Sequence, residues 1–173
     1  TTKGIRNANS ILTYIDNIDL SEEIKNKYIG QAYFHRAFRY YLLVFQYGDV
    51  PFMTKLLEVP KLNFRSTTRD AILDRLILDM EFAIKWVPEQ KDMDMVGQVN
   101  KGACRQLLIK CYLATGQWEK AKEQADILID KSGYELMKEP FGTFVESGEP
   151  ETWKITRNVI WDLHRPENKL LTS

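Results

Sequence analysis

The sequence lacks the features that mark a membrane span or a nucleic-acid surface. No apolar run approaches the ~20 residues that a membrane-spanning helix requires. The 24 Lys and Arg are balanced by 24 Asp and Glu, whereas phosphate binding needs an excess of basic residues, so no nucleic-acid partner is expected. A signal-peptide pattern is also missing, and the chain runs from Thr1 straight into patterned sequence. We therefore expect a piece of a longer protein.

Residues that bind metals or form disulfides are scarce, with two cysteines and two histidines. Cys104 and Cys111 are seven residues apart on one predicted helix, which separates them by ~10.5 Å along its axis. A disulfide needs Cα atoms within ~7 Å, and zinc ligands use closer spacings. We therefore expect both thiols to be small buried packing groups. His35 and His164 lie far apart in the sequence, so neither a metal nor another cofactor is predicted.

Motifs of catalysis are also missing. The sequence has no Gly-x-Ser-x-Gly elbow, no phosphate-binding glycine loop and no His-Glu-x-x-His. Asp92 and Asp94 flank Met93 in a polar stretch, but two neighbouring acids are a common solvated feature. The sequence predicts a protein that is not an enzyme.

Apolar residues recur at three- and four-residue spacing, which predicts helices. The expected helices span residues 5–18, 22–47, 67–87, 100–115 and 118–131. The second half of 22–47 is apolar around nearly its whole circumference, which predicts burial by neighbours on both sides. Glycine and proline interrupt the chain after Tyr134, and residues 158–163 alternate as in a short extended segment. We expect a helical scaffold over 1–135 and an irregular segment over 136–173.

The last two predicted helices resemble one tetratricopeptide repeat. The run from Cys111 to Ala121 (CYLATGQWEKA) places Gly116 at the turn and Ala121 where two helices cross closely. A step of 34 residues towards the N-terminus puts Phe82 at the turn position, where glycine is needed. The fold is therefore predicted to be all-α, with degenerate helix-turn-helix pairs of the tetratricopeptide (TPR) type in an α-α superhelix rather than a regular array.

Five collinear motifs resemble one protein family. They are GIRNANSIL at 4–12, GQAYFHRAFRYYL at 30–42, FQYGDVPF at 45–52, GQVNKGA at 97–103 and AKEQADILIDKSGYEL at 121–136. Their order and spacing resemble the SusD/RagB family of nutrient-binding lipoproteins. The likeness runs from Gly4 to about Leu163, over the helical scaffold that members of this family share.

That resemblance implies a non-catalytic, surface-exposed lipoprotein of the Bacteroidetes outer membrane. It implies a TonB-dependent, SusC-like transporter as partner, a glycan or oligosaccharide (in some members a peptide) as ligand, and a lipid anchor outside these 173 residues. Most ligand-contacting groups of the family lie in parts that this chain does not match. The alternative from the residues alone is a TPR-type adaptor that binds a peptide or protein partner.

The four tryptophans are the first candidates for a sugar-stacking platform. Trp118 sits at a repeat position that packs between helices, and Trp86 ends an apolar seam, so both are expected in the core. Trp161 falls in the alternating segment and is expected to be half-buried. Trp153 lies in a polar stretch and is the one, weak, ligand-binding candidate, although a tryptophan in such a loop more often folds back onto its scaffold.

The aromatic stripe of the second predicted helix is expected to be core rather than a ligand site. Arg36 and Arg39 lie three residues apart on that helix. We expect them to pair with acids of neighbouring helices or to pack their stems on aromatic rings, with a partner-facing surface as the alternative.

Overall fold

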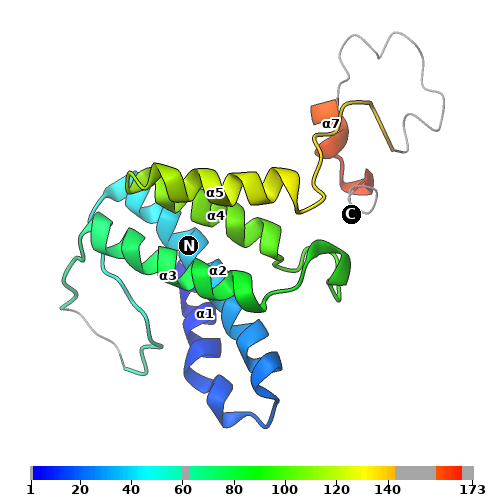
Figure 1. Cartoon of the computed structure of the whole chain (residues 1–173). Coiled ribbons are helices and arrows are strands. Elements are labelled where there is room, and N and C mark those ends of the chain that lie inside the picture. The colour runs from blue at the N-terminus through cyan, green and yellow to red at the C-terminus, as the bar shows by residue number, and fades with distance from the viewer. Residues whose placement is uncertain (1, 60–62, 143–158, 169–173) are drawn as a thin grey trace.

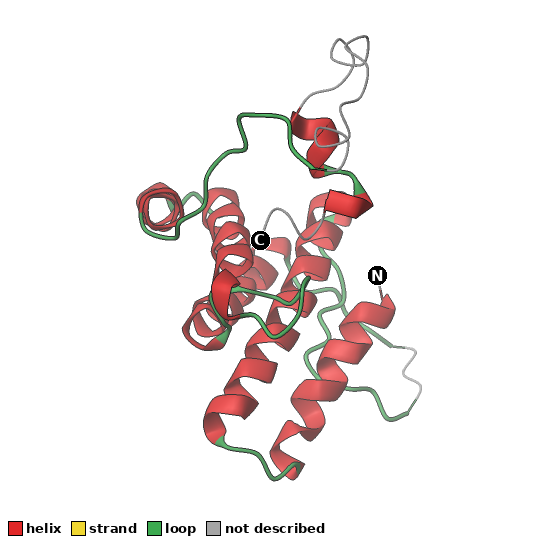
Figure 2. Cartoon of the chain, turned by 90° about the vertical axis from the view of Figure 1, so that its right-hand side faces the viewer, coloured by secondary structure: helices red, strands yellow, loops and turns green. Residues whose placement is uncertain are grey.

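The computed structural model describes residues 2–59, 63–142 and 159–168. Its first five helices follow one another along the chain, and each packs on the next (Figure 1). In order, they are α1 (Thr2–Tyr14), α2 (Glu22–Tyr47), α3 (Arg69–Trp86), α4 (Lys101–Ala114), α5 (Trp118–Asp130) and α7 (Val159–Leu163). Within the described residues, three 3₁₀ turns accompany them: η1 (Ile15–Asn17), η2 (Gln90–Asp92) and η4 (Pro166–Asn168). The all-α prediction is confirmed, and Figure 2 shows only helices and loops in the described ranges.

Side-chain caps mark the starts of α2, α3 and α4. Ser21 accepts a hydrogen bond from the Ile24 amide at the start of α2, and Asn100 accepts one from Ala103 at the start of α4. Such caps satisfy amides that have no partner within the helix. The cap of α3 is Thr68, which accepts from Ala71, so α3 begins at Arg69 rather than at residue 67, where the sequence analysis starts the helix. Thr67 pairs instead with Val50 in an isolated antiparallel bridge, because both its backbone groups bond to that residue.

The core lies where α2, α3 and α4 meet. Its fully buried members come from all three helices and include Tyr40, Leu76, Met80 and Leu108. Cys104 and Cys111 are buried, unbridged members of the same core, as predicted. Burial raises the pKa of each thiol to about 12, because an apolar environment disfavours the thiolate.

The α4–α5 pair has the predicted helix-turn-helix form. Gly116 makes the turn with a φ of 72°, in the left-handed region that glycine adopts without strain. Ala121 is only 3% exposed, which agrees with a close crossing. Trp118, in contrast, is 63% exposed and Trp86 is 38% exposed, so the prediction that both belong to the core is wrong. In the described part of the chain, no later helix pair covers Trp118 at the start of α5.

The second half of α2 is not buried on all sides as predicted. Tyr40 is fully buried, but Phe38, Phe45 and Tyr47 are 39%, 52% and 64% exposed. The helix packs on α1 and α3, and these two neighbours cover only part of its circumference. The second half of α2 therefore has apolar residues around nearly its whole circumference, but one of its faces is covered and the other is open.

The segment predicted to be extended at 158–163 is a helix over its described residues. α7 lies beyond the C-terminal end of α5 (Figure 1). The buried Asp162 of α7 accepts a hydrogen bond from the Phe141 amide, so this contact brings α7 to residues 141–142. Trp161 is half-buried, as expected, but it lies on a helix. The division of the chain at residue 135 stays a prediction.

None of the described helices combines the length and the apolar character needed to cross a membrane.

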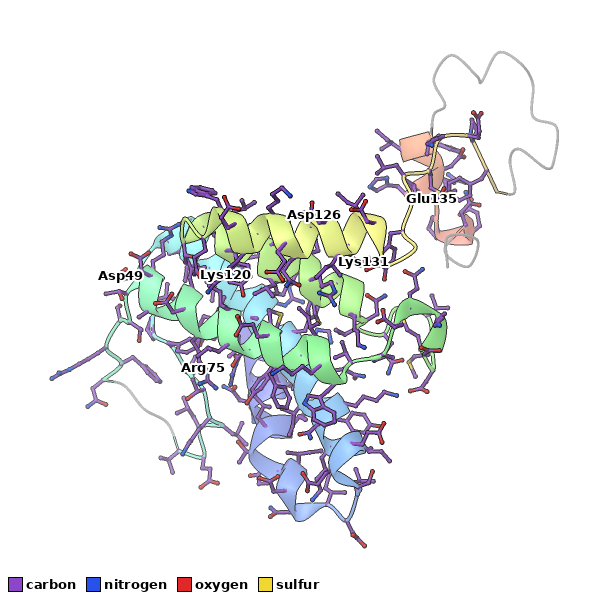
Figure 3. All side chains as sticks on the ribbon, viewed as in Figure 1. Asp49, Arg75, Lys120, Asp126, Lys131 and Glu135 are labelled. Carbon is purple, nitrogen blue, oxygen red and sulfur yellow. The ribbon has the colours of Figure 1, made fainter. Side chains whose placement is uncertain are left out.

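The long connection between α2 and α3 begins at Asp49, which is labelled in Figure 3. The carboxylate of Asp49 accepts a hydrogen bond of 2.8 Å from the Arg69 amide. This contact and the Val50–Thr67 bridge hold the two ends of the connection together.

Candidate functional site

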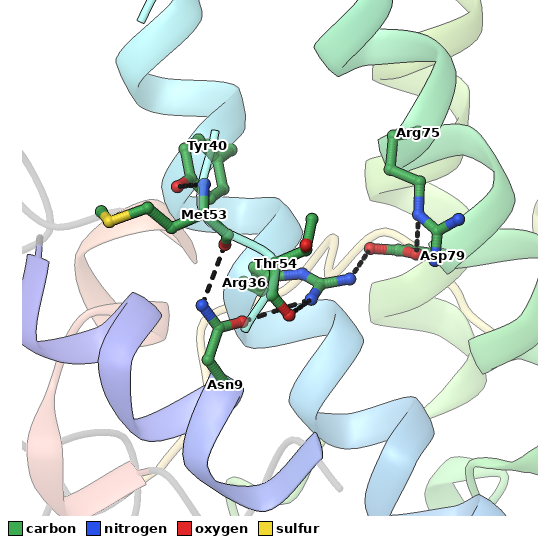
Figure 4. A network of polar contacts seen from close by, with 7 residues as sticks. All are labelled: Asn9, Arg36, Tyr40, Met53, Thr54, Arg75 and Asp79. Atoms are coloured by element: carbon green, nitrogen blue, oxygen red, sulfur yellow. Dashed lines mark hydrogen bonds and ion pairs between the residues drawn. The ribbon is translucent and has the colours of Figure 1, made fainter. Parts of the chain in front are cut away.

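A buried polar network joins three helices to the connection that follows α2 (Figure 4). At its centre is Arg36 of α2, whose side chain is 2% exposed. Its Nη2 donates to Asp79 Oδ2 of α3 at 2.6 Å, and its Nη1 donates to Asn9 Oδ1 of α1 at 3.2 Å. Nη1 also donates to the Thr54 carbonyl at 3.2 Å. One guanidinium therefore holds α1, α3 and the connection at fixed positions around α2.

Asp79 lies between two arginines. Arg75, one turn earlier on α3, places its Nε 3.0 Å from Asp79 Oδ1. Burial raises the pKa of Asp79 above its usual value, and the positive charges of Arg36 and Arg75 oppose that rise. A buried carboxylate is tolerated here because an arginine nitrogen lies within ion-pair distance of each of its oxygens. The predicted pairing of Arg36 with an acid of a neighbouring helix is thus confirmed.

The connection is held through its backbone by buried side chains. Asn9 Nδ2 donates to the Met53 carbonyl at 2.9 Å and to the Lys55 carbonyl at 3.3 Å. The Tyr40 hydroxyl accepts from the Met53 amide at 2.7 Å and donates to the Pro51 carbonyl at 3.3 Å. Residues 51–56, called here the anchored segment, are therefore positioned by groups from α1 and α2. Their side chains project from a backbone that is already ordered, which is what a preorganised binding surface requires.

Three clefts border the anchored segment, and Lys55 lines all of them. One cleft, of about 420 Å³, lies against α1, α2 and α3 and is lined by Leu12, Thr13, Tyr33, Arg36, Thr54, Lys55 and Arg75. A second, of about 500 Å³, lies within the connection and includes Phe52, Phe64 and Arg65. The third is small and apolar, about 120 Å³, and includes Arg6 and Asn9.

Aromatic rings and polar groups both line these clefts. The Phe64 side chain is 40% exposed. Phe52 is half-buried and packs edge-on against Tyr40, with ring centroids 4.7 Å apart. Tyr33 lies under the Arg36 guanidinium, whose central carbon is 5.0 Å from the ring centroid. Rings of this kind can stack on the C–H face of a pyranose while neighbouring polar groups bind its hydroxyls.

Another cleft, of about 860 Å³, lies at the other end of the helical stack, between the η2 region and the residues that follow α5. It is lined by Glu89 and Glu135 as well as by Arg105 and Lys131. Glu89 is paired with Lys101 at 3.3 Å. With Lys91 also in the lining, this cleft carries charged residues of both signs.

The candidate from the sequence, Trp153, lies outside the described residues. The anchored segment was not predicted as a site, although GDVP at 48–51 and the long connection after it were visible in the sequence. Asn9 and Tyr40 carry no local signal of their role, since an asparagine or tyrosine on a helix is ordinary. Their partners lie 44 and 13 residues away, a distance at which sequence periodicity indicates nothing.

The chain is similar in sequence to members of a known protein family. A SusD-like family model, described as "Starch-binding associating with outer membrane", matches residues 2–113. SusD-like protein P2 of Formosa agariphila is 28% identical over 141 residues, which cover 79% of this chain and 27% of that protein. The chain spans 27–30% of the length of the curated relatives it matches.

Solved structures share the fold. A SusD-like carbohydrate binding protein from Bacteroides vulgatus superposes with a TM-score of 0.67 at 27% identity, over 78% of this chain and 30% of that one. Surface glycan-binding protein A from Bacteroides uniformis superposes with a TM-score of 0.70 at 26% identity, over 80% and 32%. With the family model matching well over half of the residues, this chain belongs to the SusD-like family.

Proposed function

We propose that this chain is the helical scaffold of a non-catalytic, cell-surface glycan-binding protein that serves an outer-membrane uptake system. In this proposal a TonB-dependent, SusC-like transporter is the partner, and a lipid anchor holds the protein at the outer membrane. Membership in a family described as starch-binding and associated with the outer membrane supports both the ligand class and the location. The solved relative named as a surface glycan-binding protein supports the same ligand class.

The observation that carries the proposal is the anchored segment with the ring-lined cleft beside it. Phe64 offers an exposed ring in the same cleft as Phe52, and the backbone of the anchored segment is held by Asn9, Arg36 and Tyr40. Buried contact area does not by itself give affinity for a ligand, because binding also costs the entropy of ordering mobile groups. A surface that is ordered before binding avoids the cost of ordering a loop. We therefore propose that this chain contributes to glycan binding through the clefts around residues 51–59 and 63–65.

The test is affinity electrophoresis of the protein encoded by the complete gene through gels that contain single polysaccharides. Retardation by one or a few glycans, with a matching change in tryptophan fluorescence on titration with oligosaccharides, is the expected result. Lack of retardation across a broad panel would contradict glycan binding and favour a peptide or another ligand.

A pair of variants tests the location. Phe64→Ala is expected to weaken retardation, because it removes the ring that lines the 500 Å³ cleft. Phe45→Ala is the matched control, since Phe45 is similarly exposed but lies near the end of α2 and lines none of the three clefts. Equal effects of the two variants would exclude the 500 Å³ cleft as the binding surface.

A further inference from the structure

The clefts around the anchored segment are unusual in their charge. Five basic residues line them: Arg6, Arg36, Lys55, Arg65 and Arg75. Among the described residues, none that lines these clefts is acidic, although the chain as a whole has no net charge. A random sample of a neutral chain would bring in both signs, as the cleft lined by Glu89 and Glu135 does.

Within the described structure, acidic side chains neutralise only part of the positive charge around these clefts. Asp79 pairs with Arg36 and Arg75 from beneath and offsets only one of their two charges. Within the described residues, Lys55 and Arg65 have no ion-pair partner. Glu58 follows the anchored segment but lines none of the three clefts. The surface therefore keeps an excess of positive charge.

The basic groups are also held in place. The carbonyl of Lys55 is bonded to Asn9 and that of Thr54 to Arg36, so the backbone that carries the Lys55 ammonium is fixed. Arg75 is held by its contact with Asp79 while 46% of its side chain stays exposed. In Figure 3, Arg75 lies near the connection between α2 and α3, whereas Asp126 and Glu135 lie over α5 and beyond it. Positive charges gathered in a cleft focus the field on a ligand of the opposite sign.

We propose that the ligand of this surface is an anionic saccharide, one that carries uronate carboxylates or sulfate esters. The inference rests on the proposed function and adds the charge class of the glycan. The rings of Tyr33, Phe52 and Phe64 take the sugar faces, and Lys55, Arg65 and Arg75 take the anionic substituents. An uncharged glucan would leave Lys55 and Arg65 without an ionic partner and would gain nothing from the excess positive charge of this surface.

The experiment compares three groups of polymers in affinity electrophoresis and calorimetry with the protein of the complete gene. The groups are neutral glucans, glycans with uronate or sulfate groups, and poly-glutamate as an anion without sugar. Selective binding of an anionic glycan that weakens as salt rises, with poly-glutamate bound at least tenfold more weakly, supports the proposal. The uronate and sulfate arms show which anionic group is recognised.

Lys55→Gln and Arg65→Gln are each expected to lower the affinity for the anionic glycan about threefold to tenfold and to reduce its salt dependence. Lys110→Gln is the matched control, because Lys110 is exposed on α4 and lines none of the three clefts. Equal effects of Lys55→Gln and Lys110→Gln would overturn the assignment to these clefts.

The remaining outcomes separate this inference from the proposed function. Binding of neutral glucans with no gain for anionic ones would overturn the charge class and leave glycan binding intact. Equal binding of poly-glutamate and anionic glycans would overturn saccharide recognition in favour of an acidic polymer in general. Absence of binding to every glycan would overturn both proposals.

Discussion

The α4–α5 pair and the anchored segment at 51–56 are ordered by different forces. In the pair, a three-residue connection centred on Gly116 brings neighbouring helices together, and small residues such as Ala121 let them approach closely. The anchored segment has no regular structure of its own and depends on Asn9, Arg36 and Tyr40 for its hydrogen bonds. The first region gains from apolar burial, and the second from the satisfaction of polar groups in a buried place.

This difference matters for function. Close helix packing builds a rigid frame but leaves few groups able to meet a polar ligand. A segment without helical bonding can present its side chains on an otherwise helical protein, provided that its backbone groups find other partners. The buried Arg36–Asp79 pair provides such a partner where three helices meet the segment, because Arg36 donates a hydrogen bond to a backbone carbonyl of the segment. We therefore expect that substitutions of buried polar side chains disturb the anchored segment, whereas substitutions that change side-chain volume disturb the α4–α5 pair.

The largest effect is expected for Arg36→Met. The variant leaves the buried Asp79 with only Arg75 and removes the donor to Asn9 and Thr54, so the free energy of unfolding should fall by about 3–5 kcal/mol. Urea denaturation measures this loss. Arg39→Met, one turn later on the exposed side of α2, is the control and should change stability by about 0.5 kcal/mol or less. Similar losses for the two variants would refute the anchoring role of Arg36.

An intermediate effect is expected for Ala121→Leu. Ala121 is 3% exposed within the core, and a larger side chain should overpack the α4–α5 crossing at a cost of ~1–3 kcal/mol. Glu123→Leu, at an exposed position of the same helix, controls for the added apolar group. The thermal midpoint of unfolding is the measurement, and an unchanged midpoint for Ala121→Leu would show that the repeat register is wrong.

The smallest effect is expected for Trp118→Ala. Because the Trp118 side chain is 63% exposed, its removal should cost about 1 kcal/mol or less, compared with ~2–5 kcal/mol for Leu108→Ala in the core of α4. Both variants are compared by chemical denaturation. A loss for Trp118→Ala as large as that for Leu108→Ala would mean that the start of α5 is covered, as the sequence pattern suggested.

Local patterns predicted much of the fold. The bounds of α2 and the turn at Gly116 follow from caps, glycine and apolar spacing, and both agree with the structure within a residue or two. The prediction for 158–163 was wrong because a two-residue alternation over so short a run does not distinguish a strand from one turn and a half of helix. Trp118 was misplaced because a repeat position is buried only where a following repeat covers it.

The sequence by itself determined the helical class, the positions of most helices, the burial of the two cysteines and the family resemblance, because each rests on residues close together or on motifs in a fixed order. Only the tertiary structure decided which of the aromatic residues of α2 are covered, and it alone brought Asn9, Arg36 and Asp79 to one point beneath residues 51–56. The same folding gathered basic residues from four separate parts of the chain around these clefts. Electrostatic and hydrogen-bond energies depend on distance in space, and a distance between residues far apart in the chain exists only after the helices have packed.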